Sequence, residues 1–238
     1  MKILAKFNAC HALLIASLVL HGCATTSSLR ESAKQLSPAQ YGYVAGSFSV
    51  SCKNLTSILG EEYCNQGFNS MSVAFSRSDG TGFDRLDSVW GKVLGEDTKY
   101  DFTRDQKKGY FFCFPLPTGN YKFYGLSYYN FAGGGSGYST QNDHRFSLPF
   151  SVVSSQVTNL GAITMTTSEG KNFLGLSVFG PGQLELSKIS DSGITSALLK
   201  CPETKDRPIV DATLSSELGG NTPEVRYVAT SAEKPPNK

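Results

Sequence analysis

Short segments with an apolar residue at every second position recur along this 238-residue chain and constrain its fold more than any other feature. This alternation is typical of strands that bury one face, and the segments are separated by turns rich in Gly, Pro, Asn and Ser. We therefore expect an all-β fold, an antiparallel β-sandwich over residues 43–205. The expected strands are residues 43–52, 71–75, 110–115, 121–129, 146–153, 157–165, 173–179 and 184–189.

Turn residues place the connections between these strands. Gly180-Pro181-Gly182 predicts a hairpin between the last two strands, and Gly125 predicts a bulge or a close backbone approach. The polar stretches at residues 65–70 and 78–85 and the charged stretch at residues 97–108 are expected to be loops.

One helix is expected near residues 191–201. Asp191 or Ser192 would cap it, and Ile194, Leu198 and Leu199 would form its apolar stripe. Pro202 stops the pattern, and we expect the helix to cover an edge or end of the sandwich.

The N-terminus has the pattern of a lipoprotein signal peptide over residues 1–22. Lys2 and Lys6 precede an apolar run at residues 12–20, which is about 14 Å long as a helix and too short to cross a bilayer core of about 30 Å. The run ends in Leu20-His21-Gly22-Cys23, which resembles a bacterial lipobox. We expect Cys23 to carry a diacylglycerol and an N-acyl chain such as palmitate, which together anchor the protein in a membrane. The alternative is an ordinary secretory signal with a stray cysteine.

The residue after the lipidation site bears on localisation. Ala24 stands where an Asp typically retains Gram-negative lipoproteins in the inner membrane, so we expect the outer membrane, with the domain facing the periplasm or the surface. Residues 23–42 are expected to form a lipid-anchored flexible tether, in which a short helix at residues 29–36 would have little to pack on. Residues 206–238 are expected to be a partly disordered C-terminal extension.

The charge balance argues against nucleic acid as a partner. The chain has 22 Lys and Arg against 20 Asp and Glu, and removal of Lys2 and Lys6 with the signal peptide makes the two counts equal. A neutral chain with dispersed charge lacks the basic surface that nucleic acids require.

Four cysteines remain after removal of Cys10 and acylation of Cys23, and an oxidising compartment favours two disulfides among them. Three pairings are open. We favour Cys52–Cys64, which closes a short loop, with Cys113–Cys201 as the long-range bridge. A metal site is not expected, because neither a C-x-x-C pair nor a histidine partner supports one.

The turn Leu116-Pro117-Thr118-Gly119-Asn120-Tyr121 resembles a feature of transthyretin-like and carboxypeptidase-regulatory-like domains, in which a Tyr opens the strand after a Pro-Gly turn. Pro149-Phe150-Ser151-Val152, followed by the Leu160-Gly161 strand, is similar to a pattern in uncharacterised bacterial lipoproteins. The resemblance covers residues 41–202 and implies a transthyretin-like β-sandwich; the short strands also fit an immunoglobulin-like one. It implies no catalytic residue and no cofactor other than the lipid.

Few residues offer catalytic chemistry. His144 is the one histidine left in the mature chain, so nucleophilic hydrolysis would depend on it. We expect His144 to be an ordinary surface residue in the loop before the strand at residues 146–153. The carboxylates Glu61, Glu62, Asp101 and Asp105 match a glycosidase only by residue type. The glycine run at residues 133–137 lacks the helix and the Lys of a phosphate loop.

The aromatic residues around that glycine run are the best candidates for a binding surface. Alternation places Tyr121 and Phe123 on one face of their strand and Tyr124, Leu126 and Tyr128 on the other. The surface that would take a glycan or a protein partner comprises Tyr128, Tyr129, Phe131 and Tyr138.

The sequence thus predicts an outer-membrane lipoprotein that acts as a non-enzymatic binding or structural module at the cell envelope. An accessory lipoprotein of a secretion or assembly machine is the first alternative. An envelope hydrolase that uses His144 is the second.

Overall fold

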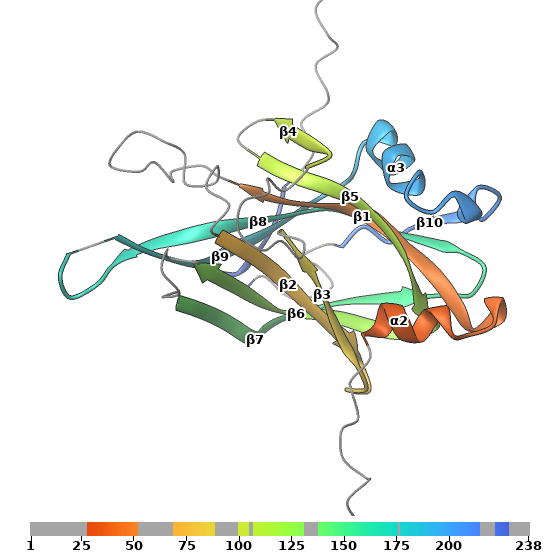
Figure 1. Ribbon diagram of the computed structural model, residues 1–238, viewed down its shortest axis with the longest axis horizontal. Coiled ribbons are helices and arrows are strands. Elements are labelled where there is room, and N and C mark those ends of the chain that lie inside the picture. Colours follow the sequence, from red (N-terminus) through yellow and green to blue (C-terminus); the bar gives the residue numbers. More distant parts are fainter. Residues whose placement is uncertain are drawn as a thin grey trace, which may run out of the picture.

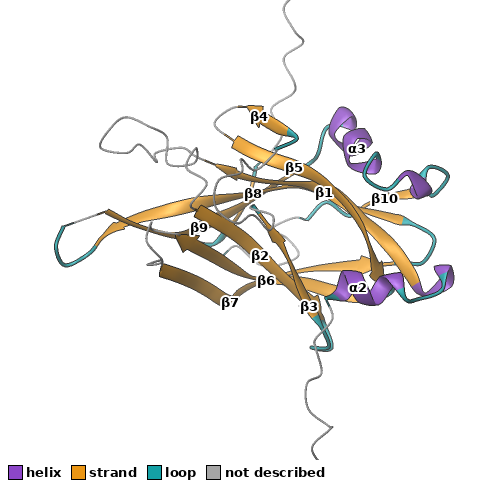
Figure 2. Cartoon of the chain, in the orientation of Figure 1, coloured by secondary structure: helices purple, strands orange, loops and turns teal. Residues whose placement is uncertain are grey.

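The computed structural model describes residues 28–51, 69–88, 100–104, 107–130, 138–175, 177–214 and 222–228. Within this part of the chain, strands form two sheets that face each other, and short helices flank them (Figures 1 and 2). The expected all-β class is confirmed. Cys23, Cys52, Cys64 and Phe131 lie outside the described residues, so the predictions for them stay predictions.

The larger sheet has the order β11-β9-β8-β1-β5-β4, and β10 also pairs with β8. Its strands are β1 (Tyr41–Ser51), β4 (Phe102–Arg104), β5 (Lys107–Pro117), β8 (Val157–Lys171), β9 (Ser177–Ser187), β10 (Ile209–Asp211) and β11 (Val225–Tyr227). The smaller sheet has the order β3-β2-β6-β7. Its strands are β2 (Asn69–Arg77), β3 (Phe83–Asp87), β6 (Gly119–Asn130) and β7 (Tyr138–Val152).

Strand β1 lies at the centre of the larger sheet and is covered on both faces. It pairs antiparallel with β5 but parallel with β8, and β10 and β11 also pair parallel with their neighbours. The expectation of a purely antiparallel fold was therefore wrong for the larger sheet. The reason is that β1 meets β8 only after the chain has passed through the smaller sheet, so no hairpin dictates their relative direction.

Apolar side chains from both sheets form one continuous core between them. The larger sheet contributes Val44, Phe48, Phe112, Leu116, Ile163, Met165, Leu184 and Leu186, and the smaller sheet contributes Met71, Val73, Phe75, Leu86, Tyr121, Phe123, Leu126, Tyr128, Leu148 and Phe150. Part of the expected loop at residues 78–85 is strand β3, because Leu86 completes this core as β3 pairs with β2.

A bulge in β6 reverses which face its side chains occupy. The pairing of β6 with β2 shifts register between Ala74 and Phe75, where Tyr124, next to the glycine that predicts a bulge, is one extra residue in β6. As a result Tyr121, Phe123, Leu126 and Tyr128 are all buried in the same core. The simple alternation, which placed Tyr128 on the face opposite to Tyr121, was therefore wrong.

The hairpin between β8 and β9 turns earlier than expected. Gly180-Pro181-Gly182 lies inside β9 and not at a turn. The register of β9 with β8 shifts beside this segment, between Met165 and Thr167 of β8. The described part of the turn comprises residues 172–175, with the Asn172 side chain accepting a hydrogen bond from the Leu174 amide. The glycines and proline therefore form a bulge in a continuous strand, which is the other setting in which such residues occur in sheets.

Helix α3 (Asp191–Leu198) is confirmed, but its cap lies one residue earlier than expected. The Ser190 hydroxyl accepts a hydrogen bond from the Gly193 amide at 3.2 Å. Leu199 follows the helix and is exposed, so it does not belong to the apolar stripe.

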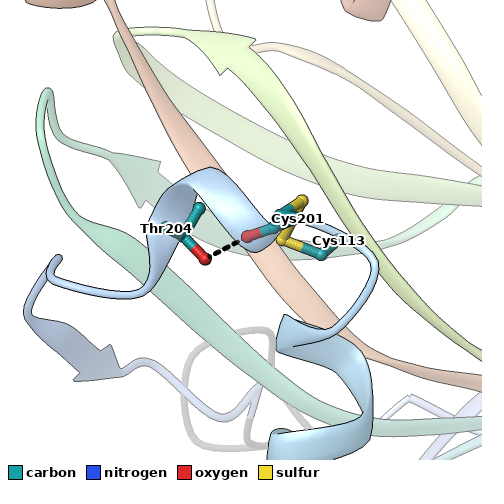
Figure 3. The surroundings of a disulfide bond; sticks show 3 residues. All are labelled: Cys113, Cys201 and Thr204. Carbon is teal, nitrogen blue, oxygen red and sulfur yellow. Dashed lines mark hydrogen bonds between the residues drawn. A yellow bond between two sulfur atoms is a disulfide. The ribbon is translucent and has the colours of Figure 1, made fainter.

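The α3 stripe packs on the outer face of the larger sheet and not on its edge or end. Ala197 and Cys201 are buried there with Tyr43, Ala45 and Val157, and Ile194 and Leu198 pack against them. Cys113 on β5 and Cys201 form the predicted disulfide, with their Cα atoms 5.7 Å apart (Figure 3). The bridge and the apolar stripe together hold the helix on the sheet.

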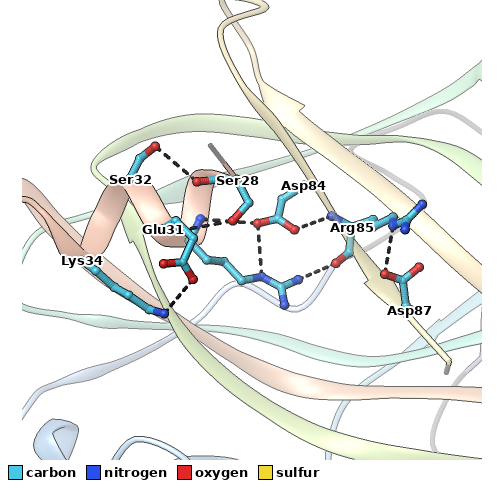
Figure 4. Close-up of polar contacts among 8 residues, drawn as sticks. Ser28, Glu31, Ser32, Lys34, Asp84, Arg85 and Asp87 are labelled. Atoms are coloured by element: carbon cyan, nitrogen blue, oxygen red, sulfur yellow. Dashed lines mark hydrogen bonds and ion pairs between the residues drawn. The ribbon is translucent and has the colours of Figure 1, made fainter. Parts of the chain in front are cut away.

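Helix α2 (Leu29–Lys34) and the 3₁₀ turn η1 (Pro38–Gln40) belong to the folded domain. Leu29 and Ala33 are buried, and α2 contacts β5 of the larger sheet and β3 of the smaller sheet. The Arg30 guanidinium lies 4.0 Å from the Phe114 ring centroid and 3.3 Å from an Asp84 carboxylate oxygen. Figure 4 shows Ser28 and Glu31 of this segment facing Asp84 and Arg85 of β3. The expectation of a flexible tether was therefore wrong for residues 28–42, because two apolar residues at i,i+4 spacing suffice to dock this short helix.

The expected C-terminal extension also contributes to the sheet. Residues 209–211 pair with β8, residues 225–227 pair with β9, and Leu214 and Val225 are buried in the core. The domain boundary at residue 205 was therefore wrong, and the domain reaches at least residue 228. Short strands of three residues lack a periodic pattern, and for this reason the sequence did not indicate them.

The connection from β5 to β6 crosses from one sheet to the other. Gly119 has φ +146°, and the Arg77 guanidinium lies where a side chain at Gly119 would project. Just beyond the turn, the Tyr121 hydroxyl donates a 2.6 Å hydrogen bond to the Pro117 carbonyl oxygen. We call residues 117–121 the β5–β6 corner.

Candidate functional site

An open groove of about 650 Å³ lies between the edge of the smaller sheet and the C-terminal part of the larger sheet. One side is formed by the last residues of β7 and the turn after it, which contribute Pro149, Phe150, Ser151, Val153 and Gln156. The other side is formed by Thr158, Lys188, residues 210–213 and Tyr227. Segments far apart in the sequence thus meet at this groove, which we call the β7–β10 groove.

The exposed side chains of the groove are mostly apolar. Val153, Val210 and Tyr227 line it and are 48%, 43% and 39% exposed. Ile209 precedes Val210 and is also exposed. Large apolar side chains exposed singly are ordinary on protein surfaces, whereas here several of them line one concave site.

Strand β10 offers backbone groups beside the groove. The Val157 amide donates to the Pro208 carbonyl, and the Ala212 amide donates to the Asn159 carbonyl, so these groups point toward β8. In a parallel ladder the intervening residues Ile209 and Asp211 direct their amides and carbonyls to the other side. Among the described residues β10 pairs with β8 alone, which makes it an edge strand.

Two charged side chains, Lys188 and Asp211, line the groove together with its apolar and uncharged polar residues. The Asp211 carboxylate accepts hydrogen bonds from the Thr213 hydroxyl at 2.6 Å and from the Thr213 amide at 3.0 Å. The Thr213 hydroxyl contributes most to lowering the pKa of Asp211, and the Lys188 ammonium contributes further. Asp211 therefore stays ionised at neutral pH, and the groove presents one negative and one positive charge.

The structure places Tyr128 and Tyr129, two of the aromatic residues predicted to form a binding surface, on opposite faces of β6. Tyr128 is fully buried in the core, so its place in that surface was wrong. Its neighbour Tyr129 is 38% exposed on the opposite face of β6, and Tyr138 pairs with Asn130 at the start of β7. The side chain of Tyr138 lies outside what the structure describes.

The candidate hydrolytic residues are not brought together by the described part of the chain. The backbone of His144 lies within strand β7, beyond Asp143, which pairs with Gly125, and its side chain is outside the description. The expectation of a loop at this position was therefore wrong. The Asp101 carboxylate accepts a hydrogen bond from the Phe111 amide and forms a 2.8 Å ion pair with Lys200. Through these contacts Asp101 helps to hold the end of α3 beside β5. The other candidate carboxylates, Glu61, Glu62 and Asp105, lie outside the described ranges.

Sequence reasoning missed the β7–β10 groove because half of it belongs to the expected C-terminal extension. The available signal was Pro208-Ile209-Val210, a proline followed by two β-branched residues, which favours an edge strand. Three residues are too few for alternation to be recognised.

Two kinds of feature are absent from the described residues: a metal-binding group and a membrane-spanning helix. No group of three or more His, Cys, Asp or Glu side chains among these residues has the arrangement of a metal site. None of the helices in this part of the chain has the length and apolar character needed to cross a bilayer.

Comparisons with known proteins leave the family open. No family model matches the sequence, and no curated protein matches it. Among solved structures, a leucine-rich repeat protein from Bacteroides thetaiotaomicron aligns with 55% of the chain at 14% identity and a TM-score of 0.30. The chain spans 14% of the length of that protein, and a TM-score this low assigns neither fold nor function.

Proposed function

We propose that this protein is an outer-membrane lipoprotein, anchored through Cys23, whose β domain is a non-enzymatic binding module at the cell envelope. The lipobox-like sequence at Cys23 supports the anchor. The Cys113–Cys201 disulfide supports export, because such bonds persist in oxidising compartments and are rare in the cytosol.

We propose further that the two packed sheets are a variant of the transthyretin-like or immunoglobulin-like sandwich. The β5–β6 corner supports this assignment, since a Tyr that opens a strand and bonds to the backbone a few residues upstream is a hallmark of such sandwiches. The parallel entry of β1 beside β8 is the feature that departs from the antiparallel type.

The proposed ligand of the β7–β10 groove is an extended peptide segment with apolar side chains. The observation that carries this proposal is the exposed edge strand β10 beside Val153, Val210 and Tyr227. An added strand would pair with the Ile209 and Asp211 backbone and place alternate side chains in the groove. Residues 229–238, ATSAEKPPNK, contain no large apolar side chain, which argues against this segment as the occupant.

Selection of random peptides displayed on phage against the purified mature chain tests this proposal. We expect enrichment of peptides with apolar residues at every second position. We expect their affinity to fall at least tenfold in Val210→Asp, which places a charge in the groove. Leu199→Asp is the matched control, because Leu199 is also an exposed aliphatic residue but follows α3, outside the groove. Failure to enrich such peptides, or equal binding by the two variants, would overturn the proposed ligand.

A further inference from the structure

The attachment of helix α2 limits how far the domain can stand from its lipid anchor. Leu29 is buried in the core, and the Arg30 guanidinium forms an ion pair with Asp84 and a hydrogen bond to the Arg85 carbonyl. The Ser28 hydroxyl accepts a hydrogen bond from the Glu31 amide and caps the helix. The chain is thus already held to the domain at Ser28, well before strand β1.

Five peptide units separate Cys23 from Ser28. A fully extended chain rises at most about 3.6 Å per residue, so the two Cα atoms are at most about 18 Å apart whatever the conformation between them. The flexible tether expected from the sequence, which ended at residue 42, would have reached more than about 60 Å. The shorter tether restricts the orientation of the domain. A domain of this size is roughly 40 Å across, so a reach of about 18 Å does not allow it to rotate freely above the bilayer.

We infer that the end of the domain formed by helix α2, the turn between β2 and β3, and strand β3 rests against the lipid headgroups. This inference depends on the proposed acylation of Cys23, which places that residue at the membrane surface. Partners of the domain would accordingly be met within one domain diameter of the bilayer.

The chemistry of this end fits a headgroup surface. Phe83 at the start of β3 is 55% exposed, and it follows Gly82, whose Cα lies beside the Leu29 side chain. A Phe ring at this position would reach the boundary between headgroups and acyl chains, where peripheral proteins bury such apolar side chains. The exposed Lys34 and Arg85 are paired with Glu31 and Asp87, so the patch is close to neutral and needs no anionic lipid.

Energy transfer in reconstituted vesicles tests the inference. The full lipidated chain is placed in phosphatidylethanolamine–phosphatidylglycerol vesicles that contain an acceptor-labelled lipid, with a donor on a non-natural residue at position 83. The matched control carries the donor in place of Phe173, an exposed aromatic residue in the β8–β9 turn. That turn and α2 lie toward opposite ends of the long axis in Figure 1. A second form of each protein carries a 20-residue Gly/Ser insertion between Thr25 and Thr26.

We expect transfer from position 83 to exceed transfer from position 173 at least twofold, and the insertion to reduce the transfer from position 83 by a similar factor. Acylated protein with equal transfer from the two positions, or with transfer from position 83 unaffected by the insertion, would overturn the inference alone. Protein that lacks acyl chains by mass spectrometry and stays in the aqueous phase would instead overturn the proposed anchor, and the inference with it.

Discussion

The Tyr121 hydroxyl donates a 2.6 Å hydrogen bond to the Pro117 carbonyl oxygen and closes the β5–β6 corner, where the chain passes from the larger to the smaller sheet. The Tyr121 ring stacks on Phe150 in the core, with centroids 5.3 Å apart. One side chain therefore fixes both the direction of the chain at the crossover and the packing beneath it.

Replacement of Tyr121 by Phe should lower the free energy of unfolding by about 1 kcal/mol, because it removes the hydrogen bond and keeps the ring. Urea denaturation of the purified chain measures the loss. Tyr129→Phe is the matched control, since Tyr129 lies on the same strand but is partly exposed. Equal stability of Tyr121→Phe and wild type would show that the corner is held by the turn residues alone.

Stability should decrease at high pH for a reason that involves the same side chain. Burial raises the pKa of Tyr121 to about 12, whereas an unfolded tyrosine ionises near 10. The unfolded chain then loses the proton first, so the stabilisation is complete below pH 10 and is lost as pH rises toward 12. Burial also raises the pKa of Tyr43, which acts in the same direction. Denaturation across this pH range should show a smaller decrease in Tyr121→Phe than in wild type.

The adjacent residues Tyr128 and Tyr129 should respond very differently to truncation. Tyr128→Ala removes a fully buried ring and should cost about 3–4 kcal/mol, whereas Tyr129→Ala should cost less than about 1 kcal/mol. Thermal or urea unfolding of the pair measures the difference. The opposite order would mean that β6 does not carry the bulge at Gly125.

Docking of helix α2 should be visible in stability. Leu29→Ala should reduce the free energy of unfolding by about 2–3 kcal/mol, because Leu29 is buried between the helix and the sheets. Lys34→Ala on the exposed side of the same helix removes only a surface ion pair with Glu31. This variant should change the free energy of unfolding by less than about 0.5 kcal/mol. Limited trypsin digestion at Arg30 should accelerate in Leu29→Ala. Trypsin cleavage at Arg30 in wild type as fast as in the variant would contradict the docked helix.

Loss of the Cys113–Cys201 disulfide should be costly and should loosen α3 in particular. The bridge joins residues 88 positions apart, and on the chain-entropy model it contributes about 4.5 kcal/mol. The double variant Cys113→Ala and Cys201→Ala should be destabilised by that order, and hydrogen exchange should rise first in residues 191–198. Unchanged exchange in α3 would assign its attachment to Ala197, Ile194 and the Lys200–Asp101 ion pair instead.

The local features of the fold could be predicted from the sequence. The strands expected at residues 71–75 and 157–165 lie within β2 and β8, and residues 43–51 of the strand expected at 43–52 lie within β1. The turn at residues 117–120 and the helix near residue 191 are also present. Each of these depends on alternation, turn residues or an N-cap, which act over a few neighbouring positions. The pairing of Cys113 with Cys201 was one of three open choices, and only the packing of α3 on β5 decides it.

The candidate site could not be predicted, because it is assembled from residues that are distant in the chain. Val153, Lys188, Val210 and Tyr227 meet only when β10 and β11 extend the larger sheet beside β7. Tyr128 shows the same limit at a single residue: its place inside or outside depends on one inserted residue in β6, and alternation alone does not count it.

The sequence by itself determined that this chain is built of strands, that a turn follows Leu116, that a helix lies near residue 191, and that Cys23 ends a lipobox-like tetrapeptide. These properties arise from the backbone preferences of neighbouring residues and from local apolar patterns. The tertiary structure alone decided the parallel neighbour of β1, the shift of face at each bulge, and the inclusion of α2, β10 and β11 in the domain. The reason is that these features depend on hydrogen bonds and buried contacts between residues far apart in sequence, whose free energy exceeds the weak preference of any short segment.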